Sequence, residues 1–300
     1  MTIGKIAPAG RARADAMAAR FERQYTAYAR QKTMYTALFW GAFLACLITS
    51  IIVAKFNVAT LIQGLPRTTE FLVKMIPPIH LQTFAADIGE WYWGIGKWMN
   101  NLLNTLLMAY LATVLGTLIG GALSFFAARN LVKHYATYWI TRRFLEIART
   151  VPDIVWALLF VFAFGIGPLP GVLAITVHTL GAQGKLFAEV NENISPLPVE
   201  GVRAAGGSWL QEIRFGVLPQ VLPNFMSYTF WRMELNVRSA TIVGFVGAGG
   251  IGHDLFTSIQ LLYFADAGAI LLIVITTIML IDMVSEKFRH RAIGKDSLSS

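Results

Sequence analysis

The chain has little of what a soluble enzyme carries. Charged residues make up only 14% of its 300 residues, whereas they make up about a quarter of an ordinary soluble domain. Its single cysteine, Cys46, cannot form an intrachain disulfide, so cysteine usage gives no information about the redox compartment. The low charge content argues against a soluble globular fold.

The sequence patterns of common active sites are also absent. There is no His-Glu-x-x-His and no Gly-x-Ser-x-Gly, which argues against a zinc protease and an α/β-hydrolase. There is no Gly-x4-Gly-Lys-Ser/Thr either, so the chain cannot bind ATP through a P-loop. We therefore predict no catalytic residue, no metal site and no cofactor in this chain.

Long apolar runs are the main feature that the sequence does contain. Hydrophobic residues make up 55% of the chain, and the mean hydropathy is +0.56. A helix needs roughly 20 apolar residues to cross a bilayer. We predict an all-α polytopic membrane protein with about six transmembrane helices, at residues 35–54, 102–128, two within 154–184, 217–245 and 266–284. Glycines and prolines at 165–171 separate the two helices within 154–184.

The net charge of +8 follows this predicted topology. If the N-terminus is cytoplasmic, 19 of the 25 lysines and arginines lie inside, four lie in residues 55–100 and two lie within a span. This distribution is the positive-inside bias of membrane proteins. We interpret the basicity as a mark of orientation in the lipid bilayer rather than of nucleic-acid binding, and we expect both termini to be cytoplasmic.

The predicted spans divide the chain into four parts. They are a basic cytoplasmic arm (1–32), the first transmembrane helix with an outer loop (33–100), a transmembrane core (101–290) and a cytoplasmic tail (291–300). The outer loop ends in an aromatic cluster of a kind enriched at membrane interfaces. This cluster consists of Trp91, Tyr92, Trp93 and Trp98. Within the core, residues 128–150 form a basic inner loop and residues 187–216 a second cytoplasmic loop.

A polar segment interrupts the apolar core at residues 199–223. It contains Glu200, then Gly206 six positions on, and then Leu218-Pro219 twelve positions after that glycine. Glycine permits a sharp turn, and proline can restart a helix after a break. The spacing resembles the EAA signature of the permeases of ABC importers; the alternative is an ordinary cytoplasmic connector.

In that family, such a loop forms short cytoplasmic helices that dock into a cleft on the ATPase subunit. The resemblance therefore implies a set of ATPase-coupling residues, which are Glu200, Arg203, Ala204, Ala205, Gly206 and Gly207. The chain departs from the family pattern at Gly201 and Val202, where two alanines are usual, and at Gly216, where an isoleucine is usual.

A second stretch narrows the resemblance. Residues 232–241, which read Arg-Met-Glu-Leu-Asn-Val-Arg-Ser-Ala-Thr, look like the phosphonate ABC transporter permease, as do residues 216–220 and 246–252. The likeness covers roughly residues 100–290. It is less able to separate phosphonate permeases from their phosphite or phosphate relatives.

This resemblance implies a type I ABC importer permease in the inner membrane of a prokaryote. The implied partners are a second copy of the chain, a P-loop ATPase that binds ATP and magnesium, and an extracytoplasmic phosphonate-binding protein. The implied cargo is phosphonate or a close phosphorus oxyanion. The alternatives are an importer of phosphite or phosphate, an ion-coupled secondary transporter with Glu234 and Asp282 as proton sites, and a membrane-embedded enzyme.

The predicted fifth span carries charges that are costly inside a bilayer. Each basic residue at a helix centre costs about 2.5–3.5 kcal/mol on insertion scales, so these residues should face the bundle interior or a water-filled path. Glu234 and Arg238 are four positions apart, in the order that favours an ion pair. Two interpretations stay open, namely a substrate path and an ion pair that joins helices. The candidate residues are Arg232, Glu234, Asn236, Arg238 and Ser239.

The glycine-rich run at residues 247–252 matches the dinucleotide-binding fingerprint only in form, because it follows a membrane span rather than a strand. We interpret it as flexible backbone at the outer mouth, and a plain turn is the alternative. The predicted outer gate consists of Gly247, Gly249, Gly250 and Gly252.

Three isolated ionisable residues complete the candidates. We expect His178 to form a hydrogen bond between helices and Asp153 to begin a helix, where its charge suits the helix dipole. Asp282 lies near the inner end of the sixth span, from which it can reach the membrane interface.

Overall fold

The computed structural model describes residues 8–293 of the chain, and side chains for residues 17–287. All regular elements in this range are helices, which confirms the predicted all-α class. The chain forms two compact units, residues 1–69 and 70–300. The ends of the predicted basic arm and tail, residues 1–7 and 294–300, lie outside the described range.

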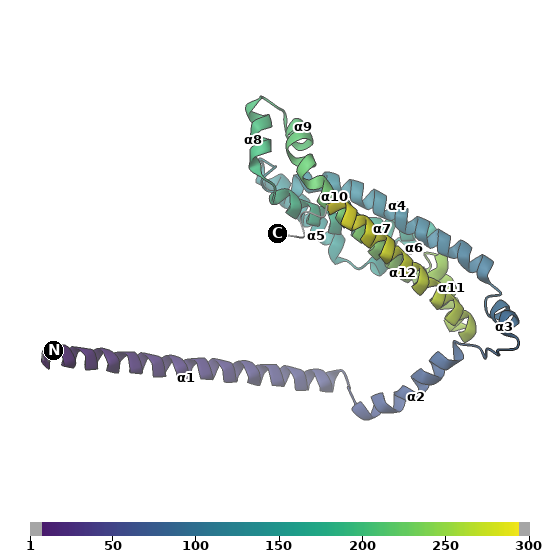
Figure 1. The fold of residues 1–300 in the computed structure, drawn as a ribbon, viewed down its shortest axis with the longest axis horizontal. Coiled ribbons are helices and arrows are strands. Elements are labelled where there is room, and N and C mark those ends of the chain that lie inside the picture. The colour runs from purple at the N-terminus through teal and green to yellow at the C-terminus, as the bar shows by residue number, and fades with distance from the viewer. Residues whose placement is uncertain (1–7, 294–300) are drawn as a thin grey trace, which may run out of the picture. The chain divides into compact units, whose positions relative to one another are not determined.

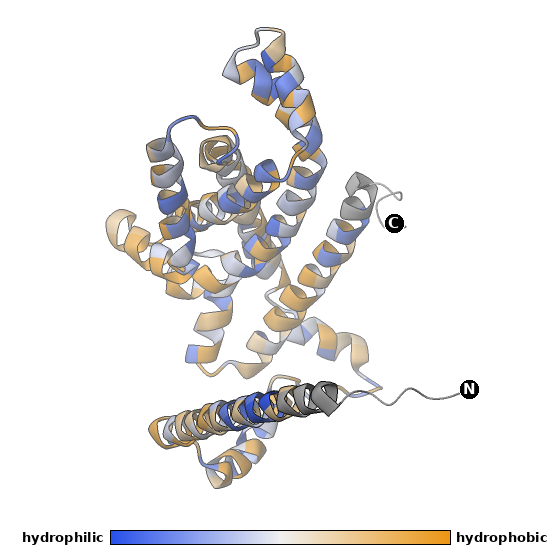
Figure 2. Cartoon of the chain, turned by 90° about the vertical axis from the view of Figure 1, so that its left-hand side faces the viewer, coloured by the Kyte–Doolittle hydropathy of each residue, from blue (hydrophilic) through white to orange (hydrophobic). Residues whose placement is uncertain are grey.

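The first unit contains one long helix and most of a second. α1 (Pro8–Val53) continues through the predicted arm and the predicted first span, because no proline occurs between Pro8 and Pro66. Its polar N-terminal part and its apolar C-terminal part are visible in Figure 2. α2 (Val58–Lys74) starts where the Asn57 side chain accepts a hydrogen bond from the Ala59 N–H at 2.8 Å. The segment predicted as an outer loop is therefore helical over these residues, and its place outside the membrane stays a prediction.

Four long helices form the body of the second unit. α4 (Ile95–Ala127), α7 (Pro168–Glu192), α10 (Leu218–Val243) and α12 (Phe264–Ile293) run side by side (Figure 1). One end of this bundle carries α3 (Phe84–Trp91) and α11 (Gly250–Gln260), and the other carries α8 (Pro196–Ala204) and α9 (Trp209–Gln211). The remaining elements are α5 (Tyr135–Thr150), α6 (Asp153–Phe164), the π-helix η1 (Glu212–Val217) and the 3-10 turn η2 (Gly244–Val246).

Length and composition identify three helices that could cross a membrane, at Met17–Val53, Ile95–Ala127 and Phe264–Lys287. Two bent helix pairs raise the number to five. α7 is the remaining helix of the predicted six, and hydropathy alone does not select it. Its 25 residues are about 37 Å long, and its polar side chains are accommodated because neighbouring helices bury much of its surface.

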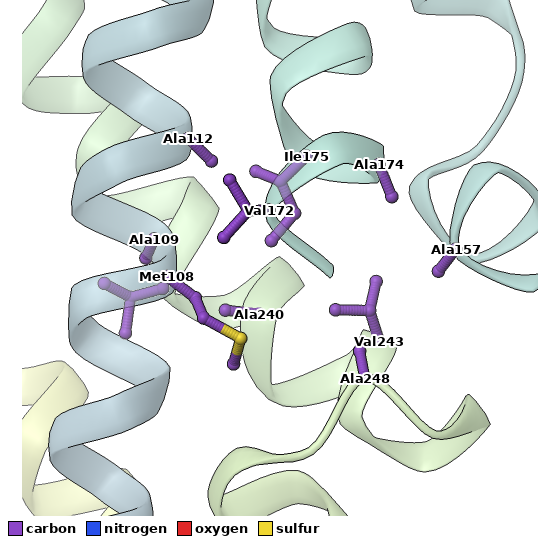
Figure 3. Close-up of a cluster of buried hydrophobic side chains, with 11 residues drawn as sticks. Met108, Ala109, Ala112, Ala157, Val172, Ala174, Ile175, Ala240, Val243 and Ala248 are labelled. Carbon is purple, nitrogen blue, oxygen red and sulfur yellow. The ribbon is translucent and has the colours of Figure 1, made fainter. Parts of the chain in front are cut away.

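Small side chains allow these helices to approach closely. A Cβ at Gly120 of α4 would lie 2.7 Å from the Leu180 carbonyl oxygen of α7, and a Cβ at Gly184 would lie 2.6 Å from a methyl of Leu145 on α5. Alanines, valines and Met108 from four helices form the core beside these contacts (Figure 3). Packing of small residues is the usual means of helix association in a bilayer, where lipid is as apolar as the side chains.

The predicted aromatic cluster is largely buried by other helices. Trp91 and Trp98 are buried with Met75 against residues of α11 and α12, and the Trp91 indole donates a hydrogen bond to the Ala265 carbonyl oxygen at 2.8 Å. Only Trp93 of these tryptophans is exposed, at 69%. Two of the tryptophans therefore pack inside the bundle, and the interfacial position of the cluster stays a prediction. Helix α4 also starts at Ile95 rather than at residue 102, because Trp98 packs as part of the bundle.

Two breaks differ from their predicted form. Only residues 165–167 of the predicted 165–171 turn are non-helical, because Pro168 fits the first turn of α7, where no N–H is needed. Helix α5 occupies most of the predicted basic inner loop at 128–150, and its cytoplasmic side stays a prediction. Pro152 disfavours a helical conformation at Val151, so α5 ends there and α6 continues at an angle of 88°.

Candidate functional site

The predicted coupling segment forms a helical hairpin, α8 and α9, that projects from one end of the bundle (Figure 1). Gly206 forms the turn with a φ of +80°, a conformation that glycine adopts without steric cost. Its N–H and that of Gly207 donate to the carbonyl oxygens of Arg203 and Val202, both at 3.0 Å. These bonds satisfy carbonyls at the end of α8, as in a Schellman cap.

The surface of this hairpin is free for a partner. Of the six predicted coupling residues, Gly207 is half-buried and the other five are exposed. Large apolar side chains are exposed beside them, with Leu197 and Leu210 at 73% and 70%. Exposed apolar groups next to polar ones are typical of a protein-binding surface.

An ion pair joins the two arms of the hairpin. Arg203 of α8 donates hydrogen bonds to both carboxylate oxygens of Glu212, at 2.9 and 2.8 Å. This hydrogen bonding, followed by Coulombic attraction to the same carboxylate, raises the pKa of Arg203 above its ordinary value. A bidentate ion pair of this kind is directional as well as attractive, so it helps to fix the orientation of α8 relative to η1.

We expect Glu212→Lys to open the hairpin, because it places a second cation against Arg203. Limited proteolysis of the purified protein should then cut between residues 203 and 212 several-fold faster than in the unmodified chain. Exchanging the two charges, as Arg203→Glu with Glu212→Arg, should restore resistance. Equal cleavage rates in the single and the exchanged variants would contradict a role for this pair.

Further contacts tie the hairpin to the bundle. The Gln220 side chain of α10 accepts a hydrogen bond from the Ser195 N–H and donates to the Gly216 carbonyl oxygen, at 3.1 and 2.6 Å. A Cβ at Gly216 would lie 2.9 Å from the Val199 Cα. The glycine that replaces the family's isoleucine is therefore required here by the close approach of α8.

The predicted ion pair on α10 is confirmed and extends to a third residue. Arg238 donates to Glu234 at 2.7 Å and to both carboxylate oxygens of Asp282 on α12, at 3.0 and 3.2 Å. Asp282 is thus in contact with a neighbouring helix, and its reach to the membrane interface stays a prediction. Sequence alone gives no signal for this contact, because the two residues are far apart in the chain.

Asn236 belongs to a different cluster, on the buried side of α10. Its side-chain amide donates to the hydroxyls of Thr113 on α4 and Thr179 on α7, at 2.8 and 3.0 Å, and all three residues are buried. Both threonines were missed from the sequence, since threonine is unremarkable in an apolar helix. This triad joins the three central helices.

We expect Asn236→Leu to destabilise the bundle by about 1–2 kcal/mol, because it leaves two buried hydroxyls without their partner. Thermal unfolding of the detergent-solubilised protein measures this. Adding Thr179→Val should not recover the loss, because the Thr179 hydroxyl also accepts the hydrogen bond of Arg232 Nε. An Asn236→Leu variant that unfolds at the same temperature as the unmodified chain would contradict this account.

Arg232 and Ser239 lie on α10 near the break between α5 and α6. Asp153, the first residue of α6, lies 2.9 Å from His178 Nδ1, and Ser239 lies beside its carboxylate. Arg232 is 9% exposed and is attracted by the Asp153 carboxylate. The expected roles of both residues are confirmed. His178 of α7 forms a hydrogen bond with Val151, which lies between α5 and α6, and Asp153 is the first residue of α6. The structure also shows that the His178 and Asp153 side chains are in contact.

The predicted outer-gate glycines form a tight connection between α10 and α11. Gly247, Gly249 and Gly250 have positive φ values of 97°, 76° and 73°, and the Gly247 carbonyl oxygen accepts a hydrogen bond from the Gly167 N–H at 3.0 Å. Gly252 approaches the Thr241 carbonyl so closely that no side chain fits. These positions require glycine for local geometry, and a gating role stays a prediction.

Comparisons with known proteins agree with this arrangement. The sequence pattern of the family described as "Binding-protein-dependent transport system inner membrane component" matches residues 120–289. The chain is 34% identical to the phosphite transport system permease protein PtxC of Stutzerimonas stutzeri, over 87% of this chain and 89% of that protein. It is 48% identical to the putative cryptic phosphonate transport system permease protein PhnE2 of Escherichia coli strain K12, over 41% of this chain and 100% of that protein.

Solved structures of ABC transporters have a similar fold. Among them is a chain from the crystal structure of a bacterial alginate ABC transporter in complex with alginate pentasaccharide-bound periplasmic protein. The TM-score is 0.58 at 13% sequence identity, covering 83% of this chain and 94% of that chain.

Proposed function

We propose that this chain, which belongs to the family of binding-protein-dependent transport system inner membrane components, is the permease subunit of an importer for a small phosphorus oxyanion, phosphonate or phosphite. The predicted type I ABC importer permease architecture agrees with the solved structure that it resembles. The observation that carries the cargo class is its 34% identity, over 87% of its length, to a phosphite transport permease.

Energy for transport comes from a separate ATPase subunit that binds ATP and magnesium, since the chain has no P-loop. The exposed hairpin, α8 and α9, is where this subunit docks. Its movement reaches α10 through the Arg203–Glu212 pair and through Gln220, which bonds Ser195 and Gly216. These contacts couple the hairpin rigidly to the start of α10, so the two move together.

The end of the second unit that carries α11 and the glycine connection faces the extracytoplasmic binding protein. Two copies of the chain then enclose the path, with both termini in the cytoplasm, as the distribution of basic residues favours. Glu234 and Asp282 both bond Arg238, which gives no support to their use as proton sites of a secondary transporter.

Reconstitution tests the proposal. The chain is co-purified with its P-loop ATPase, placed in proteoliposomes and supplied with the extracytoplasmic binding protein. We expect ATP-dependent uptake of phosphite or methylphosphonate that stops when the binding protein is omitted. Uptake that continues without ATP, or the absence of uptake of any phosphorus oxyanion including phosphate, would refute the proposed function.

A further inference from the structure

Arg232 is a buried cation that forms no salt bridge with a described residue, although the Asp153 carboxylate lies near enough to attract it. Its one hydrogen bond to a described residue runs from Nε to the Thr179 hydroxyl at 3.4 Å. Within the described part of the chain, no hydrogen bond or ion pair reaches its two terminal nitrogens, although the residue is only 9% exposed. An uncompensated charge in a spanning helix is costly and marks a functional site. A bound anion would supply the missing partner.

The neighbouring groups are arranged to meet such an anion. His178 Nδ1 faces Asp153 at 2.9 Å and the Val151 carbonyl oxygen at 3.2 Å. A ring nitrogen that bonds a carbonyl oxygen must carry the proton, so His178 Nδ1 donates to Val151. The buried Oδ1 of Asp153 is then an acceptor without a hydrogen-bond partner in the described part of the chain. The Ser239 hydroxyl contacts the same carboxylate. Helix α6 also begins here, and its positive N-terminal end favours negative charge.

We propose that Arg232, Ser239 and Asp153 form a transmembrane site for a monoprotonated phosphorus oxyanion. Arg232 and Ser239 donate to the ionised oxygens, and the Asp153 carboxylate accepts the hydrogen bond of the P–OH group. The site rests on the proposed function and adds to it the protonation state of the cargo. His178 is a positioning residue, because it acts only through Asp153.

This arrangement selects against fully ionised anions of similar shape. A carboxylate cannot donate a hydrogen bond, and sulfate at neutral pH has no proton to give it. An anionic oxygen would then face the Asp153 carboxylate, where like charges repel at short range. Loss of one charge-assisted hydrogen bond alone corresponds to about a tenfold loss of affinity, so sulfate should bind at least that much more weakly than methylphosphonate.

Competition on the purified complex tests the site. We expect the permease–ATPase complex, without the binding protein, to broaden the 31P NMR line of methylphosphonate, and added sulfate to reverse this broadening only at high concentration. In Asp153→Asn the side-chain amide can donate a hydrogen bond, so sulfate should compete about tenfold better. Asp254→Asn is the matched control, because Asp254 is a buried carboxylate paired with Lys97 outside the site; it should behave like the unmodified chain.

Other outcomes separate this site from the proposed function. Sulfate competition that is equal in the unmodified chain and in Asp153→Asn would overturn the site, as would the absence of any broadening by methylphosphonate. If Asp153→Asn fails to assemble, Ser239→Ala is the second test of the site. It should weaken methylphosphonate binding several-fold, and unchanged binding would overturn the site. Normal ATP-dependent uptake together with either failure leaves the importer function standing.

Discussion

Replacing Gly206 by valine is expected to reduce ATP-driven uptake by about tenfold while the membrane bundle stays folded. Gly206 has a φ of +80°, and a β-branched residue in such a conformation carries about 1–3 kcal/mol of strain. The strain falls on the turn that sets α8 against α9. The hairpin would therefore present its docking surface in the native form only in a minor fraction of molecules. Uptake and ATPase activity in proteoliposomes, with thermal unfolding as a folding check, measure the effect.

Gly201→Ala is the matched control for this prediction. Gly201 lies within helix α8, has ordinary helical backbone, and a Cβ there meets nothing within 4 Å. Alanine is favoured over glycine in a helix by roughly 0.5–1 kcal/mol, and alanine is usual at this position in the ABC importer signature. Uptake should stay at the level of the unmodified chain. Equal uptake in Gly206→Val and Gly201→Ala would refute the coupling role of the turn.

The coupling hairpin was predictable from sequence because its signals are local. Glu200, Gly206 and Pro219 follow one another at fixed spacing, and the turn needs nothing from the rest of the chain beyond a glycine with positive φ. The all-α class was predictable for a similar reason, since an apolar run of about 20 residues indicates a transmembrane helix by itself. Both predictions rest on properties that a single stretch of residues contains by itself.

Contacts between distant segments were not predictable in this way. Trp91 and Trp98 have the composition of an interfacial cluster, but their burial depends on residues of α11 and α12 far along the chain. α7 is too polar for a hydropathy test, and only its neighbours show why its polar residues are tolerated. Thr179 became notable only once Asn236 and Arg232 were found to bond it.

The ionisable residues of α10 illustrate both cases. Their positions within an apolar span predicted that they need partners, and spacing alone identified Glu234 as the partner of Arg238. Spacing could not place Asp282 beside Arg238, nor show that Arg232 lies in a separate cluster with Asp153. The sequence thus identified which residues matter without separating the structural pair from the candidate substrate site.

Arg238→Met should destabilise the folded permease by about 2 kcal/mol or more, because it removes the cation that Glu234 and Asp282 share. Both carboxylates belong to spanning helices, where the loss of a counter-charge is not offset by bulk water. We expect less assembled complex and a lower unfolding temperature in detergent. Unchanged stability and uptake would show that the cluster has no part in holding α10 to α12.

A charge-neutral triple variant separates the two interpretations of this cluster. Arg238→Met combined with Glu234→Gln and Asp282→Asn removes all three charges of the cluster, so none of the three remains as an uncompensated ion, and stability should rise again toward that of the unmodified chain. If the cluster only joins helices, uptake should recover with stability. If the stable triple variant assembles with the ATPase but transports no anion, Arg238 belongs to the substrate path. Its ion pairs with Glu234 and Asp282 then describe the state without cargo.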